Sequence, residues 1–334
     1  MSEPVVNAAA LRGWSNNLNA LGCDPEMALL AAGLSAHDNA RLTDTIPLSA
    51  FANFAEYVGT HSTQSSATWL LGLNYNIAEL GDVGFAILSA KTLGNALRRF
   101  SDHFELLQDT TALEFESNAD TATIGYRILD PKIWPRHHDA LFTLGIITNI
   151  INLAAPNVLE EFEIGFESER RETGMGLSCN QISFGCDTNS ITLPVKMLDL
   201  KMPDFGQGCD LKSLSQQLAQ KRRSVPAQDR LASLIYSRLP LGGINQDDLA
   251  LKIGMSSRTM RRRLSEGKSS FQQLLDECRM KQAVLEFQAR PQHSIAQIAL
   301  KLGYAEHSNF TRAFTRWAGI PPQRFRTEKL NYTH

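Results

Sequence analysis

The sequence predicts two domains of different fold class: an α+β domain of helices on a small antiparallel sheet, then an all-α domain with two helix-turn-helix motifs. Three observations support this. Two segments in the first half alternate apolar and polar residues, as half-buried strands do. The last third contains an internal repeat with helical periodicity. Charge changes sign between the parts: residues 211–334 hold 21 Lys and Arg against 9 Asp and Glu, a net charge of +12, which leaves −14 for the rest.

The first 204 residues combine helical segments with short strands. Residues 113–117 and 121–129 alternate, and Asn118-Ala119-Asp120 between them is a turn signal, so we expect a β-hairpin. An order of helices, hairpin, helix and further strands is typical of helices packed on a small antiparallel sheet. The expected helices cover residues 7–32, 48–59, 92–104 and 137–154, and the later strands lie near 159–167, 181–186 and 190–194.

This N-terminal part offers few groups for catalysis or metal binding. The five cysteines of the chain are scattered and form no Cys-x-x-Cys pair, so we expect neither a zinc site nor a disulfide framework. His137, His138 and Asp139 are adjacent, and adjacent side chains on a helix point in different directions. We interpret them as the first turn of a helix after Pro135, and we predict no catalytic residues, no metal and no cofactor.

Two polar residues interrupt the apolar helix expected at 137–154. Asn149 and Asn152 share one face and are candidates for contacting a ligand in an apolar pocket. Hydrogen-bonded buried amides or a subunit interface explain the same pattern equally well. The helix is too short and too polar to span a bilayer. The start Met1-Ser2-Glu3-Pro4 has no basic or apolar run, so we expect no signal peptide and no membrane association.

A change of composition marks the end of this part. Residues 205–226 combine Gly206 and Gly208 with glutamines and the basic run Lys221-Arg222-Arg223, and we predict a linker here. The basic run either adds affinity for a nucleic-acid backbone or is simply solvated. The predicted domains are therefore 1–204 and 227–334.

The last third contains two copies of one helical unit. Residues 249–254 match 298–303 at an offset of 49, and Met260-x-Arg262-x-Leu264 matches Phe310-x-Arg312-x-Phe314 at an offset of 50. In each copy an apolar helix face precedes a Gly that suits a helix end with positive φ, and a second amphipathic segment follows. One copy alone would fit an ordinary helical hairpin. Two copies in register predict two helix-turn-helix motifs, at about 246–265 and 294–317.

The second copy reads Ser294-Ile295-Ala296-Gln297-Ile298-Ala299-x-x-Leu302-Gly303-Tyr304, then Phe310-x-Arg312-Ala313-Phe314-x-Arg316-Trp317-x-Gly319-Ile320-x-Pro322-x-x-Phe325-Arg326. This pattern resembles the signature of the AraC/XylS transcription regulators, and the first copy resembles the less regular first motif of that family. The likeness covers residues 226–328. It implies seven helices, with a long connecting helix that suits residues 271–285.

The N-terminal part resembles the arabinose-binding-domain-like effector domain of one branch of this family. The matching segments are Gly84-Phe85-Ala86-Ile87-Leu88, Thr92-Leu93-Gly94-Asn95-Ala96-Leu97 and Asn189-Ser190-Ile191-Thr192-Leu193-Pro194, whereas residues 157–169 depart from the family pattern. The resemblance implies that residues 1–204 bind an effector and dimerise, and that residues 227–334 bind DNA.

The resemblance also implies that the second helix of each motif enters a major groove of DNA. Arginine pairs bidentately with guanine and asparagine with adenine, and a threonine methyl group can touch thymine. For any single arginine a phosphate contact is an equal alternative. Because the two helices differ in composition, we expect unlike half-sites in a non-palindromic site. The core residues are interpreted as Met260, Leu264, Phe310, Phe314 and Trp317, and the DNA contacts as Ser257, Arg258, Arg261, Arg262, His307, Ser308, Asn309, Thr311 and Arg312.

The resulting expectation is a ligand-responsive, non-enzymatic transcription regulator of the bacterial cytoplasm. Its expected partners are double-stranded promoter DNA, RNA polymerase, a small-molecule effector and a second copy of the chain, and activation is the commoner role in the family. One alternative is a chemical or DNA-damage sensor enzyme with a DNA-binding tail. That class needs an N-terminal cysteine cluster, and Cys23 is alone there. The other alternative is a constitutive DNA-binding protein whose first domain only dimerises.

Overall fold

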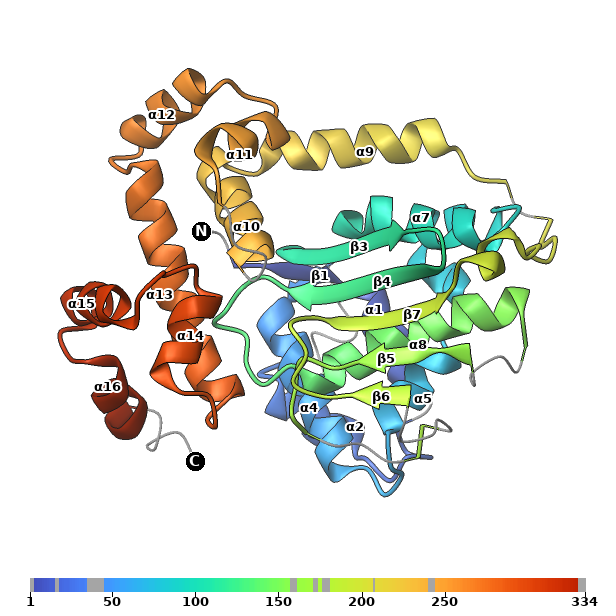
Figure 1. Cartoon of the computed structure of the whole chain (residues 1–334). Coiled ribbons are helices and arrows are strands. Elements are labelled where there is room, and N and C mark those ends of the chain that lie inside the picture. Colours follow the sequence, from blue (N-terminus) through green and yellow to red (C-terminus); the bar gives the residue numbers. More distant parts are fainter. Residues whose placement is uncertain are drawn as a thin grey trace. The chain divides into compact units, whose positions relative to one another are not determined.

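The computed structural model describes residues 3–15, 18–34, 45–156, 161–170, 174–175, 181–206, 208–239 and 244–329 (Figure 1). The chain forms two units. The N-terminal unit consists of residues 1–128 and 135–222, and the C-terminal unit of residues 129–134 and 223–334. The first is α+β and the second is helical, which confirms the predicted fold classes.

The N-terminal unit contains a five-stranded sheet in the order β3-β4-β7-β5-β6. All neighbours are antiparallel except β5 and β6, which are parallel. The predicted hairpin is confirmed: β3 pairs with β4 from Thr111↔Ile128 to Ser117↔Ala122, and the Asn118 side chain accepts hydrogen bonds from the backbone of Asp120 and Thr121 in the turn. The strands are β3 (Thr111–Ser117), β4 (Thr121–Ile128), β5 (Glu163–Gly165), β6 (Ile182–Ser183) and β7 (Asn189–Pro194).

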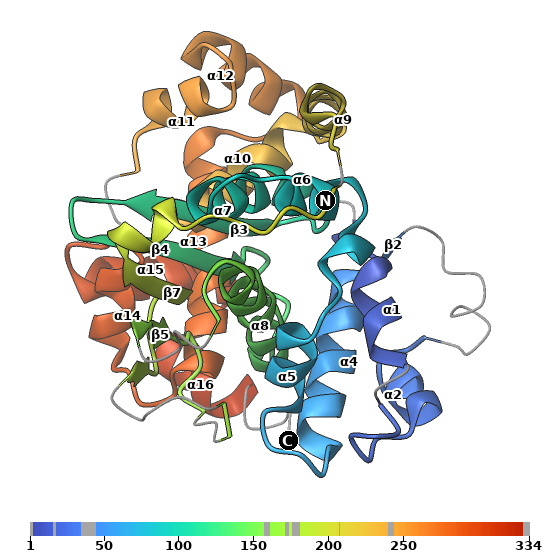
Figure 2. The ribbon, with the colours of Figure 1, turned by 90° about the vertical axis from the view of Figure 1, so that its right-hand side faces the viewer.

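Helix α8 (His137–Ala154) is the centre of this unit, and its bounds are those predicted from the sequence. It contacts β4 and β7 on one side and α4 (Leu48–His61) and α5 (Ala67–Leu73) on another (Figure 2). A β-carbon at Gly72 of α5 would collide with the Phe142 carbonyl of α8, so glycine permits this close crossing. Because it is enclosed by a sheet and by helices, α8 buries nearly every residue and shows no strong amphipathic pattern.

The prediction that residues 7–32 are helical is correct only in part. The chain forms two helices there, α1 (Ala9–Ser15) and α2 (Pro25–Ala31). Gly22 has φ +75°, and the Asp24 carboxylate accepts hydrogen bonds from the backbone of Glu26 and Met27 at the start of α2. An Asp N-cap followed by a proline at the first helical position begins α2.

Several short elements complete this unit. Helix α7 corresponds to the predicted 92–104 helix, whereas α5 and α6 were not predicted because seven residues are too few for a periodic signal. Strands β1 and β2 form a separate antiparallel pair. The remaining bounds are β1 (Val5–Asn7), β2 (Thr45–Pro47), α6 (Asp82–Leu88), α7 (Leu93–His103) and the 3₁₀ turns η1 (Ile77–Leu80), η2 (Phe104–Leu106) and η5 (Val195–Asp199).

Most of the segment predicted as a linker, 205–226, is a helix, α9 (Leu211–Ser224). Its Leu214 and Leu218 are buried. The Arg222 guanidinium donates two hydrogen bonds to Glu105, at 2.7 and 2.9 Å, and the Lys221 amine lies 2.8 Å from Asp109. Two cations of the basic run are therefore paired with carboxylates of the N-terminal unit.

The C-terminal unit contains seven helices within described residues 223–239 and 244–329, as the resemblance implies (Figure 1). The long α13 packs against helices of both halves of this unit. It contacts α10, and its residues Met280, Ala283 and Phe287 share an apolar core with α14 and α15. The helices are α10 (Ala227–Arg238), α11 (Gln246–Lys252), α12 (Ser257–Glu266), α13 (Phe271–Ala289), α14 (Ile295–Lys301), α15 (His307–Ala318) and α16 (Pro322–Lys329).

Two kinds of feature are absent from the described residues, a membrane span and a metal site. None of their helices combines the length and the apolar character needed to cross a membrane. Nor do they bring together three His, Cys, Asp or Glu side chains in an arrangement that could hold a metal ion.

Candidate nucleic-acid interface

The first helix-turn-helix consists of α11 and α12. Leu249, Ala250 and Ile253 are buried, as are Met260 and Leu264 of α12, and the two helices contact each other. Gly254 has φ +73° in the turn, where a side chain would be strained, as the sequence predicts. The side chains of Asn245 and Ser256 cap the two helices. The apolar face of each helix is therefore inward, and the opposite face of α12 is left to solvent.

The exposed face of α12 is strongly basic. Arg258, Arg261 and Arg262 lie at positions i, i+3 and i+4, so they share one face of the helix, and all three are exposed. Arg262 lies 3.6 Å from Glu266 in a solvent-exposed pair. Within the described ranges, no ion pair forms at Arg258 or Arg261. Ser257, the fourth predicted contact, is half-buried, and its hydroxyl donates to Asp247 of α11. Three arginines are thus presented together, and Ser257 instead joins the two helices.

The second motif, α14 and α15, is built on a larger core. Ile298, Ala299 and Leu302 of α14 pack with Phe310 and Phe314 of α15 and with Met280, Ala283 and Phe287 of α13. Gly303 has φ +79° in the turn. Ser294 and Gln297 form a reciprocal capping box at the start of α14. Tyr304 fills the turn: its ring lies 5.5 Å from that of Phe310, and the Arg279 guanidinium lies 4.9 Å from it on the other side.

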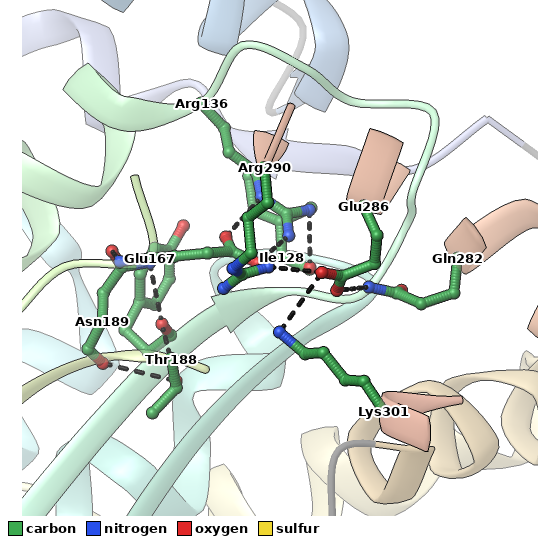
Figure 3. A network of polar contacts seen from close by, with 10 residues as sticks. Ile128, Arg136, Glu167, Thr188, Asn189, Gln282, Glu286, Arg290 and Lys301 are labelled. Atoms are coloured by element: carbon green, nitrogen blue, oxygen red, sulfur yellow. Dashed lines mark hydrogen bonds and ion pairs between the residues drawn. The ribbon is translucent and has the colours of Figure 1, made fainter. Parts of the chain in front are cut away.

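A buried carboxylate attaches α14 to α13. Glu286 of α13 accepts hydrogen bonds from Gln282 at 3.0 Å and Arg290 at 2.6 Å, and the Lys301 amine of α14 lies 3.3 Å away (Figure 3). Glu286 and Arg290 are each 1% exposed. A buried charge is tolerated when it is paired and hydrogen-bonded in this way. This cluster was not predicted, although Glu286 and Arg290 at i and i+4 in an apolar helix are a signal that the sequence contains.

The exposed face of α15 is mixed in chemistry. His307, Ser308, Asn309 and Arg312 are exposed, and Thr311 is half-buried. The Arg312 Nη2 donates to the Asn309 Oδ1 at 2.6 Å, so these two side chains form one hydrogen-bonded pair. The Ser308 hydroxyl lies 3.3 Å from Glu306. The structure therefore brings the predicted contacts of α15 onto one surface, in which Asn309 and Arg312 are coupled.

One interpretation of the core is wrong. Met260, Leu264, Phe310 and Phe314 are buried, but Trp317 is 46% exposed. Its ring touches that of Phe314 at 5.6 Å. Trp317 lies at the edge of the apolar face of α15, so one side of the indole packs and the other is solvated.

The two candidate ligand-contacting residues of the N-terminal unit, Asn149 and Asn152, differ in their hydrogen bonding. The Asn149 amide donates to the Tyr75 carbonyl at 2.7 Å, which ties α8 to the chain after α5 and fits the alternative of a hydrogen-bonded amide. The Oδ1 atom of Asn152 is buried and has no hydrogen-bond partner among the described residues. The two residues are three positions apart on α8 but do not share a partner.

The His137-His138-Asp139 run is a helix start, as interpreted, and His138 and Asp139 have separate partners. His138 donates its backbone N–H to Glu56 at 2.8 Å, and its Nδ1 lies 3.1 Å from the Thr68 hydroxyl. Asp139 accepts a hydrogen bond of 2.6 Å from Tyr126. Burial raises the pKa of Asp139 to about 7, and that hydrogen bond opposes the shift.

A buried ion pair joins the start of α8 to the sheet. Arg136 donates to Glu167 at 2.7 and 2.9 Å and to the Ile128 carbonyl at 2.8 Å, and Asn189 accepts from the Glu167 backbone at 2.9 Å (Figure 3). These hydrogen bonds hold the start of α8 against the sheet.

Comparison with known proteins agrees with this architecture. Residues 22–202 match the family described as the arabinose-binding domain of AraC transcription regulators, and residues 249–328 match a helix-turn-helix domain family. The chain is 27% identical over 271 residues to an uncharacterized HTH-type transcriptional regulator of Mycobacterium tuberculosis, with 76% of each chain covered. It is 25% identical over 271 residues to the ornithine utilization regulator of Pseudomonas aeruginosa, with 77% of each covered.

The chain is also similar to a solved structure. The transcriptional regulator CdpR from Pseudomonas aeruginosa aligns over 93% of this chain and 97% of that one, with 18% sequence identity and a TM-score of 0.37. The family assignment depends on the matched domain, which spans more than half of the chain. The chain therefore belongs to the AraC transcription regulators that carry this N-terminal domain, with an effector-binding domain followed by a helix-turn-helix DNA-binding domain.

Proposed function

We propose that this regulator occupies promoter DNA by placing α12 and α15 in successive major grooves, and that a small molecule bound by the N-terminal unit controls this occupancy. The observation that supports the first part is the pair of motifs on one connecting helix, each with a polar face opposite a buried one. Two such helices on one face of B-DNA lie about 34 Å apart, one helical turn.

The two helices suit different chemistry on DNA. Arg258, Arg261 and Arg262 of α12 present guanidinium groups that fit phosphate oxygens or guanine edges. On α15, Asn309 suits adenine and Thr311 suits a thymine methyl group, while His307, Ser308 and Arg312 complete the surface. Each monomer would then read two unlike half-sites in a direct, non-palindromic order.

The test begins with the full-length chain and a pool of random duplexes, from which bound sequences are enriched. On the selected duplex, Arg262→Ala or Arg312→Ala should weaken binding by about 1–3 kcal/mol, measured by fluorescence anisotropy. The control is Arg324→Ala, an exposed arginine of α16 outside both recognition helices, which should change the Kd little. Unchanged affinity in both test variants would refute this placement of the helices.

The second part, effector control, concerns the N-terminal unit. An effector shifts a regulator between two states only through its different affinity for them. Regulation would act on a homodimer in the cytoplasm, with activation by contact with RNA polymerase. A thermal-shift screen of metabolites on the full chain tests it, since a ligand that binds the folded state raises Tm. If no small molecule does so, a constitutive DNA-binding protein that only dimerises becomes the better description.

The alternative of a chemical or DNA-damage sensor enzyme gains no support from the two buried cysteines, Cys23 and Cys278. Such chemistry needs a thiolate. Burial raises the pKa of Cys23, and it raises the pKa of Cys278 to about 12. Both thiols therefore stay protonated and are poor nucleophiles, so neither Cys23 nor Cys278 supports covalent chemistry.

A further inference from the structure

A cavity of about 720 Å³ lies in the N-terminal unit between α7, η2, the edge strand β3 and helix α9. The ribbons of these elements can be followed in Figures 1 and 2. Its size is in the range that small-molecule sites occupy. One wall comes from residues 101–105 and the floor from residues 113–116, and α9 supplies the opposite wall. The helix that covers the cavity is therefore the one that precedes the DNA-binding unit in the chain.

The walls are rich in carboxylates. Asp102, Glu105, Glu114 and Glu116 all line the cavity. Glu114 and Glu116 are exposed and lie two residues apart on β3, so their side chains project to the same face of the strand. Apolar contact surface comes from the buried Leu113 and Leu218.

A buried histidine adds an acceptor of a different kind. His103 lines the cavity and is 8% exposed. Its Nδ1 lies 2.9 Å from the Arg99 carbonyl, and because a carbonyl only accepts, this nitrogen carries the proton. In the neutral ring Nε2 then has a lone pair, and within the described part of the chain it makes no hydrogen bond. Ser101, also in the wall, donates its hydroxyl proton to the Leu113 carbonyl at 2.7 Å, which leaves its oxygen as an acceptor.

The cavity already holds one guanidinium, which belongs to the protein itself. Arg222 of α9 lines it and binds Glu105 through both Nε and Nη2, the bidentate geometry that arginine and carboxylate prefer. The hydrogen bonds to Glu105 raise the pKa of Arg222. The side chains of the pair are 49% and 47% exposed, and such exposed pairs are weak and easily exchanged.

We infer that this cavity binds a small organic cation with ammonium or guanidinium groups, and that the ligand competes with Arg222 for Glu105. The bound cation would place its N–H donors against the carboxylates of β3 and the Nε2 of His103. Loss of the Arg222 contact would loosen the last turn of α9, which continues through Val225 and Pro226 into α10. This inference depends on the proposed effector control and names its ligand class and site.

Binding can be measured by calorimetry on the full-length chain in 150 mM salt, with agmatine as the probe. Butane-1,4-diol and succinate are the uncharged and anionic controls. We expect saturable one-to-one binding of agmatine and none of the controls. The double variant Glu114→Gln/Glu116→Gln should weaken agmatine binding at least tenfold. Glu163→Gln, which removes an exposed carboxylate of β5 outside the cavity, should leave it unchanged.

The competition between the ligand and Arg222 for Glu105 can be measured separately. Arg222→Gln removes the internal guanidinium, so agmatine should bind several-fold more tightly to this variant. Absence of saturable agmatine binding, or equal binding by the double variant, overturns the site. Unchanged affinity in Arg222→Gln overturns the competition. Duplex binding measured without agmatine tests the DNA-binding proposal separately. A Tm increase with some other metabolite, together with no saturable agmatine binding, would preserve effector control while excluding this cavity as its cationic site.

Discussion

The two helix-turn-helix motifs share one backbone plan but differ in what supports them and in what they expose. In the second motif, Phe314 contacts the rings of Phe287, Phe310 and Phe325 at 5.3–5.7 Å, and Glu286 joins α13 to α14 below it. The first has an aliphatic core around Leu264 and an arginine-rich exposed face. The two copies of a duplicated motif can therefore differ in what they offer to DNA. The first offers positive charge, and the second offers a surface held rigidly by its core.

The largest expected effect tests the difference in core packing. Phe314→Ala should lower the free energy of unfolding by about 4 kcal/mol, because it removes a fully buried ring from an aromatic cluster. Leu264→Ala, at the matching position of the first motif, should cost about 3 kcal/mol. Urea unfolding followed by circular dichroism gives both values. If Leu264→Ala is the more costly change, the second motif is not the better-packed one.

An intermediate effect is expected from the buried carboxylate. Glu286→Gln removes the buried charge that pairs with Arg290 and Lys301 and should cost about 3 kcal/mol of stability. The matched control on the same helix is Glu277→Gln, which breaks the solvent-accessible pair with Lys281 and should cost less than about 1 kcal/mol. Equal losses in the two variants would show that the Glu286 cluster does not anchor α14.

The smallest expected effects concern affinity for DNA, and they test whether α12 and α15 contribute to it in different ways. Arg261→Ala should weaken binding to all duplexes alike and reduce the slope of log K against log salt by about 0.9, if this arginine contacts a phosphate. Asn309→Ala should instead cost about 1–2 kcal/mol on the selected duplex only and relax the preference at one base pair of the second half-site. Salt titrations on selected and scrambled duplexes distinguish these outcomes, and a base-specific loss in Arg261→Ala would reverse the assignment.

Sequence patterns were sufficient wherever a residue's role depends on its near neighbours in the chain. Gly254 and Gly303, the caps at Ser256 and Ser294, and the apolar faces of both motifs are local features with fixed spacing, and they predict the helix-turn-helix units. The β3–β4 hairpin and the bounds of α8 were accessible for the same reason. The exposed surface of α12 then follows from helical periodicity.

Contacts between residues far apart in the chain were decided only by the tertiary structure. Helix α9 resembled a solvated linker because its partners, Glu105 and Asp109, lie more than a hundred residues earlier. Asn149 likewise bonds to Tyr75, which lies 74 residues earlier. A single sequence carries periodicity and local capping, but whether a polar side chain is paired, buried or left facing a cavity depends on elements that only folding brings together.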